Sequence, residues 1–484
     1  MVEPTKEEKY KAIIAESLSR VIRSGWIPEL GKHKSGKVRE LHFHNGLVYQ
    51  LAFDRVSAFD VVSSQLVPYK GQVLNRLNVL AMDWAQGIVK TAHLGSPDPA
   101  MIVQREHKNV GFECVVRGYL WGSAAKTYET GERVISGVEF KNDMLRYQKL
   151  DEPVFTPTTK AEVGHDESVT LEDIATVHGP KVAQQLKDIS IALYKKGAEE
   201  AEKKGKRLLD TKFEFGFDEM NNLVLIDECM TPDSSRYADS ADYEKKMPEI
   251  EKAMGGGTYK NVTELLKAKP EMAITEESKE LFREAVKDAG YDNGDTLPIV
   301  SDEAIIETAF QYINLCESLT GEDFQFTPSD LPVERRIMRS LVQSNQAYGG
   351  CVIPMLASIK DGPHWEKMKG ALDKEGVPYT EPTWDSAEKK TREVLAHIDR
   401  VNGLSIEPVV FLTAAGRGNT IGGLVAGNTE YPVITCPVFS DSATYQIDVN
   451  SSLRRPSGVP VMTVLDPGNA AGAAKRMLDM ARVN

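Results

Sequence analysis

The clearest pattern of hydrophobic and polar residues in the chain lies at 208–236, LLDTKFEFGFDEMNNLVLIDECMTPDSSR. Two strand-like runs, LLDTKFEFGF and NNLVLIDE, flank a polar turn, which predicts a β-hairpin. Because side chains alternate between the two faces of a strand, Asp210, Lys212 and Glu214 are predicted to share one face. The opposite face is predicted to carry Leu209, Thr211, Phe213 and Phe215.

Strand-like and helix-like patterns alternate on both sides of this hairpin. The runs KVRELHF, GLVYQLAF and FECVVRGYL predict strands. The polar segment 240–300, which contains a GGG break, is interpreted as partly an insertion that forms peripheral helices. Further helices are predicted at 8–23, 71–87, 169–204 and 302–320.

The pattern of predicted elements changes after residue 320. The segment GEDFQFTPSDLPVE has the prolines and acidic residues of an interdomain linker. The apolar runs CVIPMLAS, PVVFLTAA, YPVITCPV and VPVMTVL then alternate with helices at HWEKMKGALDKEG, which Gly376 would cap, and SAEKKTREVLAHIDRVNG. This order predicts an α/β domain with a buried parallel sheet. We therefore divide the chain into a first domain at 1–326, a linker at 327–340 and a second domain at 341–484.

The composition is that of a globular protein with more than one domain, because 484 residues exceed one ordinary core. The formal charge of −13 argues against duplex nucleic acid or an anionic membrane as the main partner, but it leaves room for a local phosphate pocket. The cysteines form no CxxC pair, no apolar run approaches the roughly 18 residues of a membrane span, and MVEPTKEEKYK lacks signal-peptide features. We expect a cytoplasmic protein with reduced thiols.

Several loops carry cations, hydroxyls and carboxylates that suit an anionic ligand. In KSGKVRE, Gly36 permits close backbone approach to a phosphate, and Lys37 and Arg39 would neutralise its charge. The same residues are common in solvated turns, so this motif alone leaves both interpretations open. The other candidates are Ser57 and Asp60 in FDRVSAFD, Arg117 and Ser123 in ECVVRGYLWGS, Lys160 in PTTKAEVGHDES, and Asp233, Ser235 and Arg236 in TPDSSR.

The hairpin gathers carboxylates that would repel one another in a purely structural role. A hard divalent cation held by Glu214 and Asp227 across the two strands would relieve this repulsion, and Mg²⁺ with ATP phosphates is a usual occupant of such a site. Lys212 would then serve phosphate oxygens. Chemistry alone leaves open both an ATP-dependent phosphoryl-transfer site and a structural charge cluster.

Taken in order, GKVRE, DRVSAFD, ECVVRGYLWGS, FTPTTKAEVGHDE, LLDTKFEFG and IDECMTPDSSR resemble the motifs of phosphoribosylaminoimidazole-succinocarboxamide (SAICAR) synthases over residues 20–326. The resemblance implies a two-lobed α+β ATP-binding domain and a ligase of purine biosynthesis. In that family, ATP phosphorylates the carboxylate of carboxyaminoimidazole ribonucleotide. The amine of aspartate then displaces phosphate, which gives SAICAR, ADP and phosphate.

The resemblance also implies roles for individual residues. Lys212 and Asp210 would line the reaction centre, and Glu214 and Asp227 would bind Mg²⁺. The segment 240–300 is expected to touch none of the site residues. The residues that would hold ATP phosphates are Gly36, Lys37 and Arg39. Those that would contact the ribonucleotide or aspartate are Ser57, Asp60, Arg117, Ser123, Lys160, Asp233, Ser235 and Arg236.

Residues 348–480 resemble phosphoribosylaminoimidazole (AIR) carboxylase, especially the animal-type enzyme that uses carbon dioxide directly and is fused to the synthase. The segments AAGRGNTIGGLVAGNTEYPVITCPV, which retains Arg417, and SSLRRPSGVP carry this resemblance. It implies a three-layer, flavodoxin-like α/β fold and a homo-oligomer, with an octamer as the assembly known among relatives.

The second domain departs from that family at two places. Its phosphate loop reads ASIKD, in which Ser358 and Asp361 persist but Ala357 and Lys360 replace a glycine and a serine. In SAEKKT, Glu388 stands where the family has the histidine that handles a proton during carboxylation. A glutamate titrates near about 4 and a histidine near about 6.5, unless burial raises the glutamate pKa. The domain is therefore a carboxylase with a remodelled site, a degenerate module for oligomerisation or nucleotide binding, or the site of another reaction.

Two rival functions concern the whole protein. A non-catalytic nucleotide-binding scaffold would not need the carboxylates of Glu214 and Asp227. A kinase or ligase that acts on another acid would not require carboxyaminoimidazole ribonucleotide and aspartate together for ADP release. The expected partners are small molecules and copies of the chain, rather than nucleic acid or a membrane.

Overall fold

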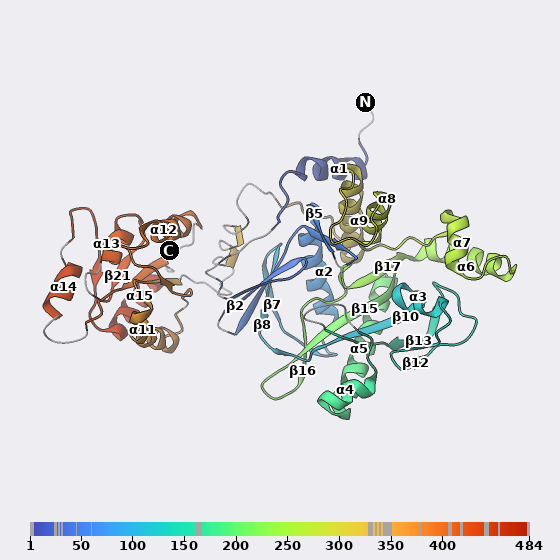
Figure 1. Ribbon diagram of the computed structural model, residues 1–484, viewed down its shortest axis with the longest axis horizontal. Coiled ribbons are helices and arrows are strands. Elements are labelled where there is room, and N and C mark those ends of the chain that lie inside the picture. Colours follow the sequence, from blue (N-terminus) through green and yellow to red (C-terminus); the bar gives the residue numbers. More distant parts are fainter. Residues whose placement is uncertain are drawn as a thin grey trace. The chain divides into compact units, whose positions relative to one another are not determined.

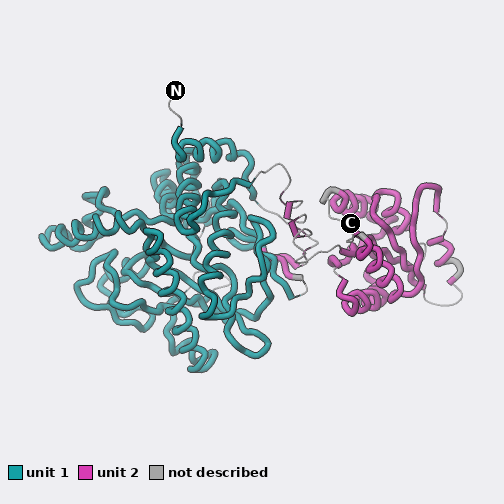
Figure 2. The backbone as a smooth tube through the Cα atoms, turned by 180° about the vertical axis from the view of Figure 1, so that it is seen from behind, with its two compact units in different colours: residues 1–24, 35–40, 46–327 teal, residues 25–34, 41–45, 328–484 magenta. Residues whose placement is uncertain are grey.

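The computed structural model divides the chain into two compact units (Figure 2). The first comprises residues 1–24, 35–40 and 46–327, and the second comprises 25–34, 41–45 and 328–484. The predicted linker at 327–340 lies largely outside the described residues. The structure describes residues 4–481 except 24–26, 28–29, 31, 45, 60, 161–166, 328–332, 334–335, 338–339, 342–350, 378, 405–408, 417–419, 440–444 and 454.

The first unit is built around mostly antiparallel sheets (Figure 1). The strands before residue 240, of which β1 and β2 fall partly in segments 25–34 and 41–45 of the second unit, are β1 (Lys32–Ser35), β2 (Arg39–His44), β3 (Leu47–Ala52), β4 (Arg55–Ala58), β5 (Val61–Leu66), β6 (Lys90–Thr91), β7 (His93–Asp98), β8 (Met101–Arg105), β9 (Lys108–Asn109), β10 (Phe112–Tyr119), β11 (Val134–Ile135), β12 (Val138–Glu139), β13 (Lys149–Phe155), β14 (Thr158–Thr159), β15 (Lys206–Phe217), β16 (Leu223–Ile226) and β17 (Ser235–Asp239). One sheet has the order β1-β2-β3-β8-β7, and a larger one has β13-β10-β15-β16-β6, with β14 paired to β10 and with β17 and β9 paired to β15. The pairs β4-β5 and β11-β12 form separate two-stranded sheets.

Helices cover these sheets because each buries an apolar stripe. They are α1 (Lys6–Ser17), α2 (Lys70–Trp84), α3 (Gly122–Glu129), α4 (Leu171–His178), α5 (Pro180–Glu202), α6 (Ser240–Gly255), α7 (Val262–Ala268), the short η2 (Pro270–Met272), α8 (Glu280–Asp288) and α9 (Asp302–Thr320). Leu77, Leu193 and Ile313, from α2, α5 and α9, join Phe213 and Phe215 of β15 in one core. Helices α6 and α7 belong to a separate core.

The predicted hairpin is confirmed, since β15 and β16 pair antiparallel with Glu214 opposite Ile226. The predicted helix at 8–23 is wrong at its end: α1 begins after the capping box of Thr5 and Glu8 and ends at Ser17, where the chain turns through a hydrogen bond from Arg20 N to Ser17 O (2.9 Å). The helical region 169–204 is broken at Gly179, whose φ of 84° a helix cannot contain.

The second unit is a parallel sheet with helices on both faces, as predicted. Its strands are β18 (Cys351–Leu356), β19 (Thr383–Trp384), β20 (Val409–Ala414), β21 (Val433–Thr435) and β22 (Met462–Thr463), in the order β19-β18-β20-β21-β22. This is the flavodoxin-like strand order. The helices are η3 (Ile359–Asp361), α11 (Gly362–Lys374), α12 (Thr391–Leu404), α13 (Thr420–Ala426), α14 (Tyr445–Leu453) and α15 (Pro467–Ala481).

Two details of the second unit correct the sequence predictions. The helix expected from Ser386 begins only at Thr391, because Ser386 O accepts the Lys390 N–H (2.8 Å) in a turn that precedes the helix. The last strand, expected to be buried, is an edge strand in which Met462 is 43% exposed. No helix in the described ranges is long and apolar enough to cross a membrane.

Candidate active site

The polar face of β15 starts with a buried carboxylate between two arginines. Asp210 lies opposite Arg117 of β10 and Arg236 of β17. Arg117 Nη1 donates to Asp210 Oδ2 at 2.9 Å, and Arg236 Nη1 donates to the same oxygen at 2.8 Å. The neighbouring Asp210 charge raises the pKa of Arg236, whereas burial lowers the pKa of Arg117. Two guanidinium groups that converge from neighbouring strands are an arrangement that suits a phosphate.

The first turn of α3 lies beside these arginines. Gly122 has a φ of 57°, and a Cβ there would lie 2.8 Å from Arg236 Cζ, so the position requires glycine. Arg117 Nη2 donates to the Ser123 hydroxyl at 3.1 Å. No side chain among the described residues caps this helix from Trp121, which leaves its first N–H groups available to an anion. The structure thus brings Arg117, Ser123 and Arg236 together.

Further along β15, two ion pairs occupy the same polar face. Lys212 pairs with Glu113 of β10. Glu214 pairs with Lys160, which follows β14, and accepts a hydrogen bond from Asn109 Nδ2 at 3.1 Å. Lys212 and Lys160 therefore supply positive charge beside a buried carboxylate.

Glu214 is buried and Asp227 is half-buried, and their two carboxylates lie side by side. Burial and the neighbouring Asp227 raise the pKa of Glu214. Burial works against ionisation of Asp227 as well, but Lys160 and Arg39 hold the pKa of Asp227 below its usual value. The described residues contain no group of three or more His, Cys, Asp and Glu that could hold a metal ion by themselves. Two carboxylates nevertheless fit Mg²⁺, which keeps water and phosphate oxygens as its other ligands.

Arg39, at the start of β2, has N–H donors that no described residue accepts. Its Nη2 donates to Glu228 Oε2 at 2.6 Å, and the Thr231 hydroxyl donates to the same oxygen at 2.6 Å. Its Nε and Nη1 are buried and have no hydrogen-bond partner within the described part of the chain. Gly36 and Lys37 lie in the exposed turn between β1 and β2, with Gly36 N donating to Arg39 O at 2.8 Å.

A second group of cations surrounds Asp233. Both of its oxygens are used: Lys70 Nζ donates to one at 2.5 Å and the Tyr312 hydroxyl donates to the other at 2.8 Å. Lys279 lies near this carboxylate, and burial lowers the pKa of Lys279 to about 8 because Asp233 offsets the cost only in part. Arg283 adds positive charge on the same side. Sequence motifs did not single out Lys279 or Arg283, because the polar 240–300 segment has no pattern that separates site from surface.

Two predicted residues lie on other surfaces of the fold than this polar face, and two more lie outside the described residues. The Ser235 hydroxyl donates to Thr211 at 2.7 Å, and Thr211 belongs to the opposite face of β15. Ser57 is buried in the separate β4-β5 hairpin. Asp60, and Arg417 of the second unit, lie outside the described residues.

The expectation that segment 240–300 touches no site residue is wrong. Glu276 lies 3.4 Å from Arg236 Nε and accepts a hydrogen bond from Trp121 Nε1 at 2.8 Å. The reason is that the chain returns after α7 and η2, so that Ala238 of β17 forms an antiparallel bridge with Glu276. Glu276 of this segment thus helps to hold the Arg236 side chain in place.

In the second unit, the candidate residues lie at the carboxyl ends of β18 and β20, the switch point where ligands bind in this fold. Ser358 accepts a hydrogen bond from Lys360 N at 3.2 Å. Asp361 Oδ2 is buried without a partner in the described ranges, and burial raises the pKa of Asp361. Glu388 Oε1 accepts a hydrogen bond from the Thr420 hydroxyl at 3.0 Å, beside the β20–α13 loop.

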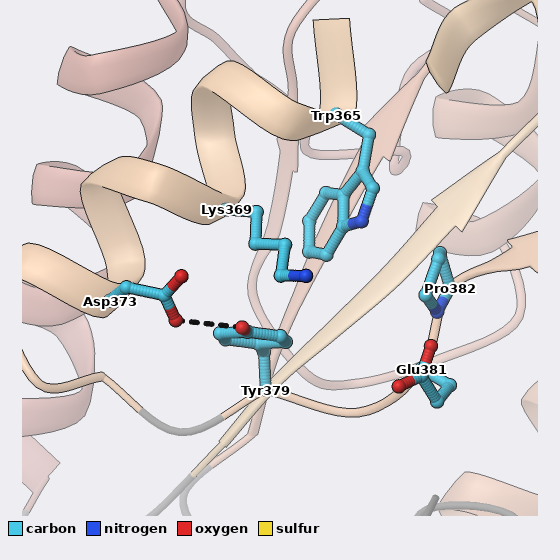
Figure 3. Close-up of a pocket in the computed structure, with 6 residues that line it drawn as sticks. All are labelled: Trp365, Lys369, Asp373, Tyr379, Glu381 and Pro382. Atoms are coloured by element: carbon cyan, nitrogen blue, oxygen red, sulfur yellow. Dashed lines mark hydrogen bonds between the residues drawn. The ribbon is translucent and has the colours of Figure 1, made fainter. Parts of the chain in front are cut away.

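A separate pocket of about 280 Å³ lies along α11 (Figure 3). The Tyr379 hydroxyl donates to Asp373 Oδ1 at 2.7 Å, and the Lys369 side chain extends into the pocket between Trp365 and Tyr379. None of the predicted site residues lines this pocket. Its lining residues are Trp365, Lys369, Asp373, Tyr379, Glu381 and Pro382.

Comparison with known proteins agrees with this arrangement. Residues 32–269 match the model of the SAICAR synthetase family, and residues 351–484 match that of AIR carboxylase. A phosphoribosylaminoimidazole-succinocarboxamide synthase of Cytophaga hutchinsonii is 34% identical over 313 residues, which cover 64% of this chain and 94% of the relative. The corresponding protein of Thermobifida fusca is 36% identical over 315 residues, 62% and 94% of the two chains. The SAICAR synthase of Saccharomyces cerevisiae, solved with SAICAR, has a TM-score of 0.53 and 25% identity and covers 63% of this chain and 99% of that one.

The fold and these relatives define a synthetase of the α+β class joined to a flavodoxin-like domain. The chain belongs to the SAICAR synthetase family. Its C-terminal domain is AIR carboxylase-like. The family and the fold class predicted from the sequence are both confirmed.

Proposed function

We propose that the first domain ligates aspartate to carboxyaminoimidazole ribonucleotide at the expense of ATP. The substrate carboxylate attacks the γ-phosphorus of ATP, which forms an acyl phosphate and releases ADP. The aspartate amine then attacks the acyl carbon, the C–N bond forms, the C–O bond to phosphate breaks, and a proton leaves the nitrogen. The observation that carries this proposal is the carboxylate pair of Glu214 and Asp227 with Lys160 and Lys212 beside it.

We assign Glu214 and Asp227 as the carboxylates that hold Mg²⁺. When bound, this ion neutralises charge on the polyphosphate and orients it. Gly36, Lys37 and Arg39 are assigned to the ATP phosphates. The unused, buried N–H groups of Arg39 support this assignment, because a buried guanidinium without partners is costly until an anion reaches it.

The two arginines on Asp210 are assigned to the phosphate of the ribonucleotide. Arg117, Arg236 and the Ser123 hydroxyl lie beside the uncapped first turn of α3, where charge-assisted and backbone hydrogen bonds would converge on one anion. Asp210, whose oxygens both face guanidinium groups, would act by orienting them. The resemblance placed Asp210 at the reaction centre, and the role proposed here is limited to positioning the two arginines.

Lys279 and Arg283 are assigned to the carboxylates of aspartate. Both lie on the side of Asp233, whose own oxygens are already occupied by Lys70 and Tyr312. Arg283 Nη1 also donates to Glu280 Oε2 at 3.1 Å, so Lys279 is the cation that supports this assignment most directly. For Ser57, Asp60, Lys160 and Ser235, a direct substrate contact rests on the family resemblance alone.

Catalysis in this scheme comes from position and charge rather than from a covalent enzyme intermediate. Cations fixed on both sides of the reaction centre lower the repulsion between the anionic substrates and the polyphosphate. Lys212, held by Glu113, would stabilise the charge that develops on the transferred phosphoryl group. The test is ADP release with each substrate omitted in turn: the proposal requires dependence on both, and release with neither would contradict it.

For the second domain we propose a nucleotide-binding and oligomerising module rather than an efficient carboxylase. Glu388 is bound by Thr420 and stands where the resemblance places a histidine. Asp361, buried with an unused oxygen, is retained for a ligand at the switch point. Steady-state consumption of aminoimidazole ribonucleotide with bicarbonate is the test, and turnover at an ordinary enzymatic rate would favour the alternative of a bifunctional enzyme.

We also propose that the protein works as a homo-oligomer in the cytosol. The cysteines are buried and free, which suits a reducing compartment: Cys114, Cys229, Cys316, Cys351 and Cys436. Sedimentation velocity of the purified chain tests the assembly.

A further inference from the structure

Asp227 has an unusual backbone conformation for a ligand residue. It follows the last residue of β16 and has a φ of 58°, in the left-handed region that favours glycine. Gln104 of β8 contacts this peptide twice. Its Nε2 donates to Asp227 O at 2.8 Å, and its Oε1 accepts the Asp227 N–H at 3.2 Å.

A second amide holds the same turn from another element. Asn78 of α2 donates from Nδ2 to Asp227 O at 3.2 Å and accepts the Cys229 N–H on Oδ1 at 2.9 Å. Gln104 is 4% exposed and Asn78 is fully buried. We call Asn78 and Gln104 the amide clamp. The clamp fixes the backbone on both sides of the Asp227 carbonyl. Its two residues lie on a helix and on a strand that are both distant from Asp227 in sequence.

We propose that the amide clamp is a positioning device that sets the affinity of the Glu214–Asp227 pair for the divalent cation. A carboxylate on a strained turn can swing with its backbone, so a ligand geometry is preserved only if the turn is held. Gln50 completes the arrangement, because its Nε2 donates to Asp227 Oδ1 and so restrains the carboxylate itself. The proposal rests on the proposed metal role of Glu214 and Asp227.

Binding of Mn²⁺, followed by electron paramagnetic resonance in the full-length protein with a non-hydrolysable ATP analogue, tests this proposal without turnover. Gln104→Met keeps the side-chain length and removes both hydrogen bonds. We expect it to weaken Mn²⁺ affinity by about 10- to 100-fold, the usual cost of losing an outer-shell partner. Asp227→Asn is expected to weaken it at least as much, and adding Gln104→Met to Asp227→Asn is expected to cause little further loss.

The chain offers a matched control at Gln65. Its Nε2 donates to Val300 O at 2.9 Å and its Oε1 accepts the Val300 N–H at 2.8 Å, the same pair of bonds at a different place. Gln65→Met is expected to leave Mn²⁺ affinity within about twofold, although it removes equivalent hydrogen bonds. A merely structural role for Gln104 would make the two variants alike in Mn²⁺ affinity.

If Gln104→Met does not fold, a second variant tests the same proposal. Asn78→Leu removes the other half of the clamp, and its control is Asn75→Leu one turn earlier on α2, where the Asn75 amide donates to Pro99 O at 3.1 Å instead. The proposal is overturned if folded Gln104→Met or Asn78→Leu binds Mn²⁺ as the parent does while Asp227→Asn does not. If Asp227→Asn also binds as the parent does, it is the proposed metal role that fails.

Discussion

The side chain of Glu214 has two neighbours with opposite effects. Lys160 pairs with it, and Asp227 repels it in a region that water scarcely reaches. A carboxylate in this position is stable only while cations remain close, so its charge depends on what else occupies the site. This sensitivity is what a nucleotide site needs, since the ion and the polyphosphate arrive together.

Glu214→Gln and Asp227→Asn are therefore expected to reduce ATP-dependent amide formation by about 100- to 1,000-fold or more. The fold is expected to persist, because neutralising one of two adjacent buried carboxylates removes repulsion. Steady-state rates and circular dichroism spectra of each variant check both statements. Near-parental turnover in either variant would show that the pair has no metal role.

At Lys279 the structure predicts a dependence on pH. Burial lowers the pKa of Lys279 to about 8, so the ammonium is present below that value and is lost as the pH rises through it. We expect KM for aspartate to rise above this pH, at most about tenfold per pH unit because one proton is involved. The measurement is KM as a function of pH.

The matched variant for this prediction is Lys279→Arg. A guanidinium stays protonated throughout the range, so the variant is expected to lose the rise in KM. An unchanged profile in Lys279→Arg would assign the pH dependence to another group.

At the scale of elements, β15 organises the site through its two faces. Phe213 and Phe215 anchor one face in the core, and the other presents Asp210, Lys212 and Glu214 to the neighbouring strands. Because β10 and β17 pair with the same strand, arginines that are distant in sequence meet at one carboxylate. The sheet register, rather than any one loop, places the charges.

The start of α3 depends on the same packing. Gly122→Ala would place a methyl group 2.8 Å from Arg236 Cζ and hold alanine in a left-handed conformation that costs about 1–2 kcal/mol. We expect a raised KM for the ribonucleotide with a smaller change in that for ATP. Gly131→Ala is the control, since it has a φ of 106° but nothing within 4 Å of the added Cβ. Equal KM effects in the two variants would remove the specific role of Gly122.

At the scale of the whole molecule, the two domains differ in how completely their sites are retained. In the first, Asp210, Lys212 and Glu214 each lie beside a partner of opposite sign. In the second, Glu388 stands where the resemblance places a histidine, and Asp361 Oδ2 has no hydrogen-bond partner among the described residues. Histidine is the side chain whose ordinary pKa lies closest to neutral pH, which suits it to exchange a proton there.

Glu388→His is accordingly expected to raise the rate of AIR carboxylation above that of the parent. The rate of aminoimidazole ribonucleotide consumption with bicarbonate measures it, and Glu388→Gln serves as the control for loss of the charge. A parent that already carboxylates rapidly, and is slowed by the histidine, would contradict the account of this domain.

Much of this architecture was predictable from local sequence. Alternation in LLDTKFEFGF predicted the two faces of β15, and the apolar runs after residue 350 predicted the parallel sheet. The contacts of Glu276 with Arg236 and Trp121 were not predictable, because they depend on a bridge between β17 and a polar segment without periodicity. The amide clamp was not predictable for the same reason. Asn78 and Gln104 belong to no sequence motif, and only the fold brings them to Asp227.

The most direct test of the central claim follows oxygen through the reaction. Carboxyaminoimidazole ribonucleotide labelled with ¹⁸O in its carboxylate is incubated with the protein, ATP and aspartate, and the released phosphate is analysed by mass spectrometry. An acyl phosphate requires one labelled oxygen to appear in each inorganic phosphate, because the C–O bond breaks when the amine attacks. Phosphate without label, formed alongside SAICAR, would contradict the account.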